Sequence, residues 1–483
     1  MVTFETKRSL PVPKNPETLA AETQFTDISN AKLFTEMFKN QVCFSRDYGG
    51  WFIYNGKTWQ KDKNSQIKSY AIEVYERLRE HLQNYTGNKF ALEAYAKHVK
   101  SSGSDGKLNS MVNRSEAFLG VPLENFDCDQ NLFNCNNGTF NLETMKFQSF
   151  DPSDLLTKIS PVDYIKEAEC PLWHKFLNDI FLGDQEVIDF MQRAIGYSMT
   201  SSIKEHCMFI FYGTGRNGKT TMIETISKIF GSYSIGLPPE SIMHKKNGNN
   251  IPNDIARLKG ARRVTVSESK ENVTLDEALI KRLTGGDLIT ARFLNKEFFD
   301  FYPVFKLFLY TNKKPNIHGT DIGIWRRIRM IPFDLTILEE EKDEALPEKL
   351  EKELSGILSW ALEGCRKWKE SGLKTPRKIL EATSIYQTEE DDIGQFIEDH
   401  CVVEEKGYIP VEIFKAMFKQ CAGYAKSQKI LAEYMRRKGF LKIDNRVRLP
   451  NGNQARAYTG IRMCDQYTTE DARPKELQPV WND

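Results

Sequence analysis

The stretch CMFIFYGTGRNGKTT, residues 207–221, decides the fold of this chain. Its apolar run, 207–212, is typical of a strand buried on both faces of a parallel sheet. The segment 213–220 then matches the pattern G-x-x-x-x-G-K-[ST], and TMIETISKIFG after it predicts a helix. This order predicts a phosphate-binding loop inside an α/β domain.

The residue types in the loop suit phosphate chemistry. Glycines let backbone N–H groups approach phosphates without a Cβ in the way, and the helix directs its positive end at the anion. Lys219 would meet the β- and γ-phosphates, and the Thr220 hydroxyl would ligate Mg²⁺. The alternative is a chance glycine-rich turn, which would not need this strand and helix. The predicted cofactors are therefore ATP and Mg²⁺, held by Gly213, Gly215, Asn217, Gly218, Lys219, Thr220 and Thr221.

Polar residues follow two further strand-like segments. Glu268 ends the segment 263–268 and is expected to orient or deprotonate the attacking water and to assist the metal. Its neighbours are Ser267 and Ser269, so a second acid is missing there. Asn312 follows the apolar run 304–310 and would hydrogen-bond the same water. The alternatives are a surface acid for Glu268 and a simple turn for Asn312.

Two arginines precede the last of these strands, 328–333. Arg326 and Arg327 are candidates to neutralise transition-state charge, either in their own subunit or in a neighbouring one. The alternative is a solvated basic strand edge.

Length and composition limit the remaining possibilities. A chain of 483 residues predicts two to four domains. Lys and Arg total 67 against 66 Asp and Glu, so the net charge of +1 excludes a uniformly basic DNA-coating protein. Without a long apolar run or a signal-peptide core, we expect no membrane partner and a cytoplasmic location. The nine scattered cysteines contain no C-x-x-C, so neither a disulfide framework nor a structural zinc site is expected.

Together these motifs resemble a known family of motors. The segments GTGRNGKT, VSE, KRLTGGDLITARFL (281–294), YTN and WRRI are similar to those of superfamily 3 helicases. The likeness is closest to the phage, plasmid and pox-virus primase-helicase branch. It extends upstream to NNG (136–138) and CPLW (170–173) and downstream to IGQF (393–396), and so covers roughly 130–465.

The resemblance implies an AAA+ type ring, usually a homo-hexamer, with ATP between subunits and 3'-5' movement on single-stranded DNA. It makes Lys219 and Thr220 the Walker A pair, Glu268 the Walker B acid, Asn312 the sensor and Arg326 the best match to the finger. It also makes 281–303 a hairpin in the central pore. The DNA contacts expected at its tip are Arg292, Phe293 and Lys296, and the alternative for Phe293 is a core position.

The sequence patterns and the resemblance together predict the domain organisation. We expect an α-rich N-terminal region with a small hairpin, a helical collar-like domain, the motor, a linker and a C-terminal winged-helix domain. The boundaries are 1–130, 131–200, 201–373, 374–389 and 390–483. No D-x-D signature occurs in 31–110, so primase activity is not expected. The chain looks like a stand-alone replication initiator of a mobile genetic element, of the phage or pathogenicity-island type.

Charge collects near the C-terminus. Residues 426–462 hold ten Lys or Arg and two acids, a net charge of +8. A helix followed by a basic hairpin fits groove recognition with a wing on the DNA backbone. The alternative is a solvated basic face that contacts proteins. The candidate contacts to origin duplex DNA are Arg436, Arg437, Lys438, Arg446 and Arg448.

Two functions from different classes remain. The first is an ATP-driven ring helicase that loads at an origin of replication. The second is a P-loop ATPase switch that binds DNA without unwinding it. Lys296 in the expected pore hairpin favours the helicase, because a switch does not need cations at a ring centre. A small-molecule kinase is disfavoured, because no acceptor pocket is evident.

Overall fold

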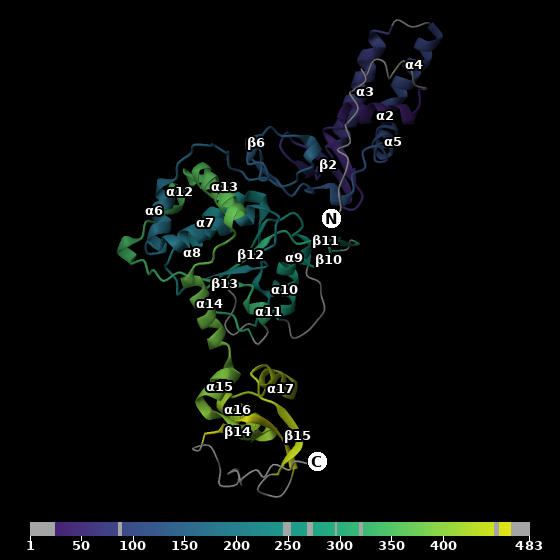
Figure 1. Ribbon diagram of the computed structural model, residues 1–483. Helices are drawn as coiled ribbons and strands as arrows, with labels where there is room; N and C mark the ends of the chain where they lie inside the picture. The colour runs from purple at the N-terminus through teal and green to yellow at the C-terminus, as the bar shows by residue number, and fades with distance from the viewer. Residues whose placement is uncertain are drawn as a thin grey trace.

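The computed structural model describes residues 25–85, 89–244, 253–267, 274–294, 297–317, 322–448 and 454–464. An α-rich unit, a central α/β domain and a small C-terminal domain follow one another along the chain (Figure 1). No helix in the described part of the chain combines the length and the apolar character needed to cross a lipid bilayer.

The N-terminal unit packs four helices beside a small antiparallel sheet. Its elements are α2 (Asp27–Phe38), β1 (Val42–Ser45), β2 (Gly50–Tyr54), β3 (Trp59–Lys61), α3 (Ile67–Gln83), α4 (Lys89–Ser102) and α5 (Asp105–Ser115). The hairpin around 55–56 is present, and β1 is an additional strand paired with β2.

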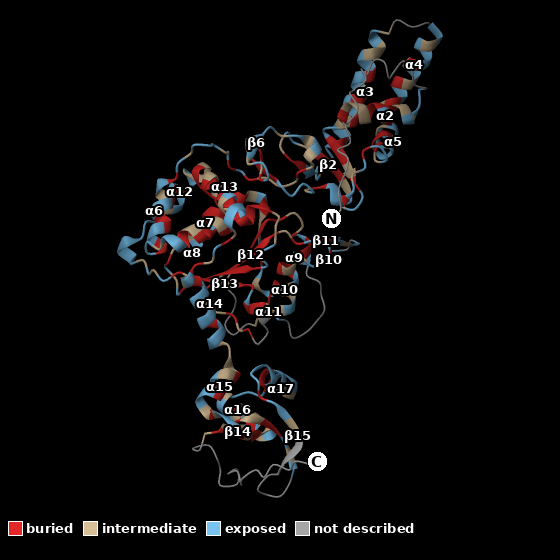
Figure 2. Cartoon of the chain, in the orientation of Figure 1, coloured by how far each residue is buried: buried red, intermediate tan, exposed pale blue. Residues whose placement is uncertain are grey.

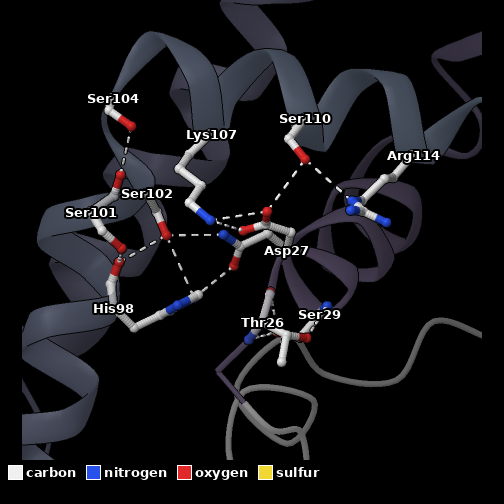
Figure 3. A network of polar contacts seen from close by, with 11 residues as sticks. Thr26, Asp27, Ser29, His98, Ser101, Ser102, Ser104, Lys107, Ser110 and Arg114 are labelled. Atoms are coloured by element: carbon white, nitrogen blue, oxygen red, sulfur yellow. Dashed lines mark hydrogen bonds and ion pairs between the residues drawn. The ribbon is translucent and has the colours of Figure 1, made fainter.

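Polar contacts hold the helices of this unit together (Figure 3). Lys107 and Ser110 on α5 donate hydrogen bonds to the Asp27 carboxylate at the start of α2. The hydrogen bond from Lys107 lowers the pKa of Asp27. Asn30 of α2 donates to Ser102 of α4 at 2.9 Å. The three helices are thus joined by one buried hydrogen bond, from Asn30 to Ser102, and by the more exposed contacts of Asp27.

A second small sheet and two helices precede the central domain. They are β4 (Leu132–Cys135), β5 (Gly138–Asn141), β6 (Lys146–Gln148), α6 (Pro171–Ile180) and α7 (Gln185–Met199). The NNG segment, 136–138, therefore lies at the turn between β4 and β5 of a three-stranded sheet. Helices α6 and α7 are separate, and Asp184 caps α7 by accepting from Val187 N.

The central sheet is parallel, as the apolar runs predict. Its strands, in spatial order, are β13 (Ile328–Pro332), β7 (Met208–Tyr212), β12 (Lys306–Thr311), β9 (Arg263–Val266) and β8 (Ser234–Leu237). The prediction of an α/β fold is confirmed. Strand β8 was not predicted, since its half-exposed, glycine-containing sequence lacks an apolar run.

Helices cover both faces of this sheet. Phe209 and Phe211 face a core shared with α7, α8 (Lys219–Phe230) and α13 (Leu354–Ser371). Met208 and Ile210 face the opposite core, which includes residues of α10 (Glu277–Gly285). Figure 2 shows the central strands buried between exposed helix faces. The remaining helices here are α9 (Asn253–Ala256), α11 (Ile322–Trp325) and α12 (Leu346–Glu351).

A short antiparallel hairpin leaves this domain at the segment expected to enter a pore. It is formed by β10 (Ile289–Arg292) and β11 (Phe298–Phe301), with Arg292 opposite Phe298.

The segment 374–389, expected as a linker, forms helix α14 (Arg377–Glu389) packed on the central domain. Tyr386 is fully buried and its ring meets Trp325 at 5.1 Å. Most of the expected linker is therefore helical, and Pro376 precedes the first residue of this helix.

The C-terminal domain contains three helices and a three-stranded antiparallel sheet. Its elements are α15 (Asp392–His400), β14 (Cys401–Pro410), α16 (Val411–Ala422), α17 (Gln428–Arg437), β15 (Lys442–Arg448) and β16 (Gln454–Met463). The strand order is β14-β16-β15. Strand β14 adds to the predicted two-strand ribbon. A separate apolar core stabilises the domain.

Candidate functional site

The glycine-rich loop lies between β7 and α8 at the carboxyl edge of the sheet. Gly215 and Gly218 have φ of 107° and 79°, which favour glycine. A Cβ on Gly218 would lie 2.6 Å from Ile180 Cγ2. A Cβ on Gly213 would lie 2.5 Å from Phe333 O. The loop is therefore confined between α6 and the end of β13, and larger residues would not fit there.

Lys219 joins this loop to strand β12. Its ammonium donates to Gly213 O at 2.5 Å, Asn217 Oδ1 at 3.1 Å and Asn312 Oδ1 at 3.0 Å. The residue is only 6% exposed. Asn217 in turn donates to Phe333 O at 3.3 Å. Three sequence-predicted residues, Asn217, Lys219 and Asn312, are thus in direct contact, although Asn312 is far from the loop in sequence.

A cavity of about 1090 Å³ opens beside the loop. It is large enough for a nucleoside triphosphate, since ordinary ligand pockets have volumes of about 300–1000 Å³. Among its lining residues, Thr220 and Thr221 begin α8, and Thr220 is exposed. The side facing the loop is formed by α6 and by residues 335–347.

Part of this lining could not be predicted from the sequence. Arg216 forms an exposed ion pair with Glu339 at 3.0 Å, and its carbonyl accepts from Ile337 N at 2.7 Å. Phe176 and Ile180 of α6 also line the cavity. These contacts join segments that are far apart along the chain, and no local sequence motif predicts them. The only pointer is CPLW at the start of α6, which belongs to the family resemblance.

The acid expected near the metal lies outside the described residues. The strand before Glu268, β9, ends at Val266, which pairs with Leu309 of β12 at the sheet edge that carries Asn312. Within the described residues no group of three or more His, Cys, Asp or Glu side chains could hold a metal ion. Thr220 therefore remains the described candidate ligand for Mg²⁺.

The two arginine candidates have different environments. Arg326 is exposed in the turn before β13 and is not among the residues that line the cavity. Arg327 is 8% exposed and donates to Thr284 Oγ1 at 3.2 Å and to Gly323 O at 2.6 Å. The Arg327 guanidinium therefore makes hydrogen bonds within its own chain in this structure, and its expected catalytic role stays a prediction.

The residues expected to contact DNA at the β10-β11 hairpin also differ in how far they are buried. Arg292 is exposed, with its guanidinium 4.9 Å from the centre of the Phe298 ring. Phe293 is half-buried and stacks on Phe299 at 5.4 Å, so it packs against the core of the domain. Lys296 lies outside the described residues.

The basic residues of the C-terminal domain are exposed at the end of α17. Arg436, Arg437 and Lys438 are all exposed. Arg437 pairs with Glu433 at 3.4 Å, and Lys438 lies 3.9 Å from Asp391. Arg446 and Arg448 belong to β15, and their side chains lie outside the described part of the structure.

Not all of the counted charge is available to a ligand. Lys426 is buried and pairs with Asp392 at 2.5 Å. Arg462 pairs with Glu404 at 2.7 Å. The net charge of the segment therefore overstates its free positive surface.

Comparison with known proteins identifies relatives. The family described as "D5 N terminal like" matches residues 31–182. The "Putative helicase L207/L206" of Acanthamoeba polyphaga mimivirus is 24% identical over 434 residues, covering 80% of this chain and 45% of that protein. The "Putative helicase 184R" of Invertebrate iridescent virus 6 is 28% identical over 341 residues, covering 62% and 35%.

A third relative and one solved structure extend the comparison. The "Putative primase C962R" of African swine fever virus is 22% identical over 312 residues, covering 56% of this chain and 31% of that protein. The structure titled "The A form apo structure of NrS-1 C terminal region-CTR" is 12% identical, covers 87% of this chain and 96% of that one, and has a TM-score of 0.45.

These matches support the resemblance, and the domain boundaries stay predictions. The chain spans about a third to a half of the length of the curated relatives it matches. The family match begins at residue 31, so it runs across the expected boundary at 130/131. The match over residues 31–182 and the similarity to proteins named as helicases and a primase are consistent with the primase-helicase branch of superfamily 3 type replication proteins.

Proposed function

We propose that this protein is an ATP-dependent DNA helicase that initiates replication as a ring, a homo-hexamer, moving 3'-5' on single-stranded DNA. The observation that carries the proposal is the 3.0 Å hydrogen bond from Lys219 to Asn312 beside the cavity. It joins the loop expected to hold phosphates to the strand end expected to sense them. The relatives named as helicases support an enzyme of DNA replication.

The residues present fit ATP with Mg²⁺. A Cβ at Gly218 would collide with Ile180, so only glycine fits this tight turn of the loop. The exposed Thr220 hydroxyl at the start of α8 would hold the ion, and the helix start favours anions. When bound, Mg²⁺ would neutralise charge on the β- and γ-phosphates.

Lys219 and Asn312 would act together. In the structure the ammonium donates to neutral oxygens. Phosphate oxygens are stronger acceptors, because charge-assisted hydrogen bonds are roughly twice as strong as neutral ones. When ATP binds, the Lys219 ammonium would therefore give up its hydrogen bond to Asn312 and donate to the γ-phosphate. The Asn312 amide would then be free to orient the attacking water. Glu268 is proposed as the base for that water.

Arg326 is the proposed finger and would act on the ATP of a neighbouring subunit. It is exposed, and no described residue forms an ion pair with it. A ring places such a residue opposite the next cavity. The hairpin β10-β11 would face the pore, where Arg292 and Lys296 would contact the DNA backbone.

The C-terminal domain would recognise origin duplex DNA as a winged helix. Its order of helices and strands and its antiparallel sheet support this classification. Helix α17, with Arg436, Arg437 and Lys438, would enter the major groove. The β15–β16 hairpin, with Arg446 and Arg448, would form the wing on the phosphates.

Phosphate release and sedimentation test the proposal. We expect ATP hydrolysis that single-stranded DNA stimulates, and a nucleotide-dependent shift from monomer to a ring. Hydrolysis that DNA does not change, by a protein that stays monomeric, would favour a P-loop switch over a helicase.

A further inference from the structure

A second cavity, of about 560 Å³, lies in the N-terminal unit and contributes nothing to the proposed ATP site. It opens between the β2-β3 hairpin, the start of α3 and the segment 157–158. Its lining combines aromatic rings, amides and lysines. The family match covers this region, which the proposed mechanism leaves without a role.

The lining carries an excess of positive charge. It contains Lys61, Lys63 and Lys158 against the single acid Asp62. That carboxylate accepts from Asn64 N at 3.1 Å, Gln66 N at 3.0 Å and Ile67 N at 2.9 Å. The Asp62 carboxylate therefore caps the backbone N–H groups at the start of α3. None of the three lysines forms an ion pair with any residue that the structure describes.

Lys158 is the most constrained of these cations. It is half-buried, and burial lowers the pKa of its ammonium. The nearby Arg257 lowers that pKa further, whereas Asp127 raises it. The Asp127 oxygens already accept from Thr157 N at 2.8 Å and Thr157 Oγ1 at 2.5 Å. A partly desolvated cation without an ion-pair partner is costly, and a bound anion would offset that cost.

The rest of the lining suits a nucleobase. Trp59 is 3% exposed, and its Nε1 donates to Pro152 O at 2.9 Å, so the aromatic floor is held in place. Tyr48 is half-buried beside it and packs against Phe52 at 5.2 Å. Amides both donate and accept, as base edges require. The amide side chains of the lining are Asn55, Gln60, Asn64 and Gln66.

We propose that this cavity binds one nucleotide unit of single-stranded DNA, with its phosphates at the three lysines and its base over Tyr48. The inference rests on the proposed helicase function, which supplies the unpaired strand. Lys61 and Lys63 are exposed at the rim. Charge that extends from half-buried Lys158 to exposed Lys61 and Lys63 suits a backbone that continues out of the cavity.

Fluorescence anisotropy with labelled oligo(dT) tests the proposal in the full chain. We expect Lys63→Glu and Lys158→Met to weaken binding about 10-fold, with a salt slope shallower by about one unit, as for loss of a phosphate contact. Lys63 is exposed, so its variant should melt at the wild-type temperature. The matched control is Lys146→Glu on the exposed strand β6, which should bind as wild type.

Cross-linking locates the site directly. An oligonucleotide carrying 5-iododeoxyuridine should cross-link to peptides that contain 48–66 or 157–158. Cross-links confined to other segments, together with wild-type affinity of both variants, would overturn the proposal. Competition by free thymidine monophosphate as effective as by oligo(dT), per nucleotide, would overturn the assignment to a strand.

The readouts separate this proposal from the proposed function. ATP hydrolysis without DNA should be the same in wild type, Lys63→Glu and Lys158→Met. If the wild type hydrolyses no ATP, the helicase proposal fails. The anisotropy and the cross-links still decide whether the cavity binds a strand.

Discussion

Lys219 connects the parts of the site through a single side chain. Its buried ammonium contacts the loop backbone, Asn217 and Asn312 at once. A lysine suits this position because its compact charge on a flexible stem can follow a phosphate when one binds. The hydrogen bonds therefore keep the ammonium in place before the nucleotide arrives.

Lys219→Ala should reduce ATP hydrolysis at least about 100-fold, since loss of one donor to a developing charge costs that much in other enzymes. An assay of phosphate release measures the rate of ATP hydrolysis. Lys228→Ala on the same helix removes an exposed lysine paired with Glu351 and should remain active. Wild-type turnover by Lys219→Ala would remove the assignment of the ATP site.

The two neighbouring arginines should fail in different ways. Arg326→Ala should lose hydrolysis without a change in melting temperature, and mixing it with Lys219→Ala should restore some activity, because mixed rings contain intact sites. Arg327→Ala should lower the stability by about 1–3 kcal/mol, because buried Thr284 and half-buried Gly323 lose a hydrogen-bond donor. Calorimetry measures the stability of both variants, and phosphate release measures their ATP hydrolysis. Unchanged stability of Arg327→Ala would contradict its structural role.

Among the elements, α7 and α13 make the closest helix contact behind the site. A Cβ on Gly196 would lie 2.0 Å from Cys365 N, and one on Gly364 would lie 2.0 Å from Gln192 O. The two backbones therefore touch, and the pair supports the face of the sheet beneath α8. Small residues at a helix crossing permit this approach.

Gly364→Ala should therefore destabilise the protein by about 1–3 kcal/mol, as overpacking does in other cores. Gly106→Ala in α5 is the control. A Cβ there meets nothing within 4 Å, and alanine is the better helix former, so its stability should be equal or higher. Equal melting temperatures of Gly364→Ala and wild type would show that the helices move apart without cost.

The elements also show what the sequence could predict. The loop 213–220 and the strands ending near Asn312 are local patterns, so they were predicted. Strand β14 was missed because only three of its ten residues are buried, so no apolar run marks it. The contribution of α6 to the cavity depends on long-range packing, which no motif records. The hydrogen bonds of Arg327 could not be predicted either, since its partners Thr284 and Gly323 come from other elements.

Across the whole molecule, α14 joins the motor to the C-terminal domain. Lys314, two residues after Asn312, pairs with Glu389 at 2.5 Å. The next residue, Glu390, accepts from Ile317 N at 2.7 Å. Trp325, beside Arg326, contacts Tyr386. The segments that carry the proposed sensor, Asn312, and the proposed finger, Arg326, therefore both contact the helix that leads to the C-terminal domain.

Removal of residues 391–483 should separate recognition from hydrolysis. The cut leaves α14 intact and removes a domain with its own core. We expect ATP turnover to persist, while preference for origin over scrambled duplex is lost, together with much of the salt dependence of duplex binding. Anisotropy at two salt concentrations measures both. Origin preference that survives the deletion would place recognition elsewhere in the chain.

Strand displacement on a forked duplex tests the central claim most directly. The full chain should release the labelled strand only with hydrolysable ATP, and only from forks whose loading strand permits 3'-5' movement. Lys219→Ala, which retains the C-terminal domain, should bind the fork and release nothing. If the wild type hydrolyses ATP on the fork but displaces no strand at any concentration, the protein is a DNA-binding ATPase and the helicase account is contradicted.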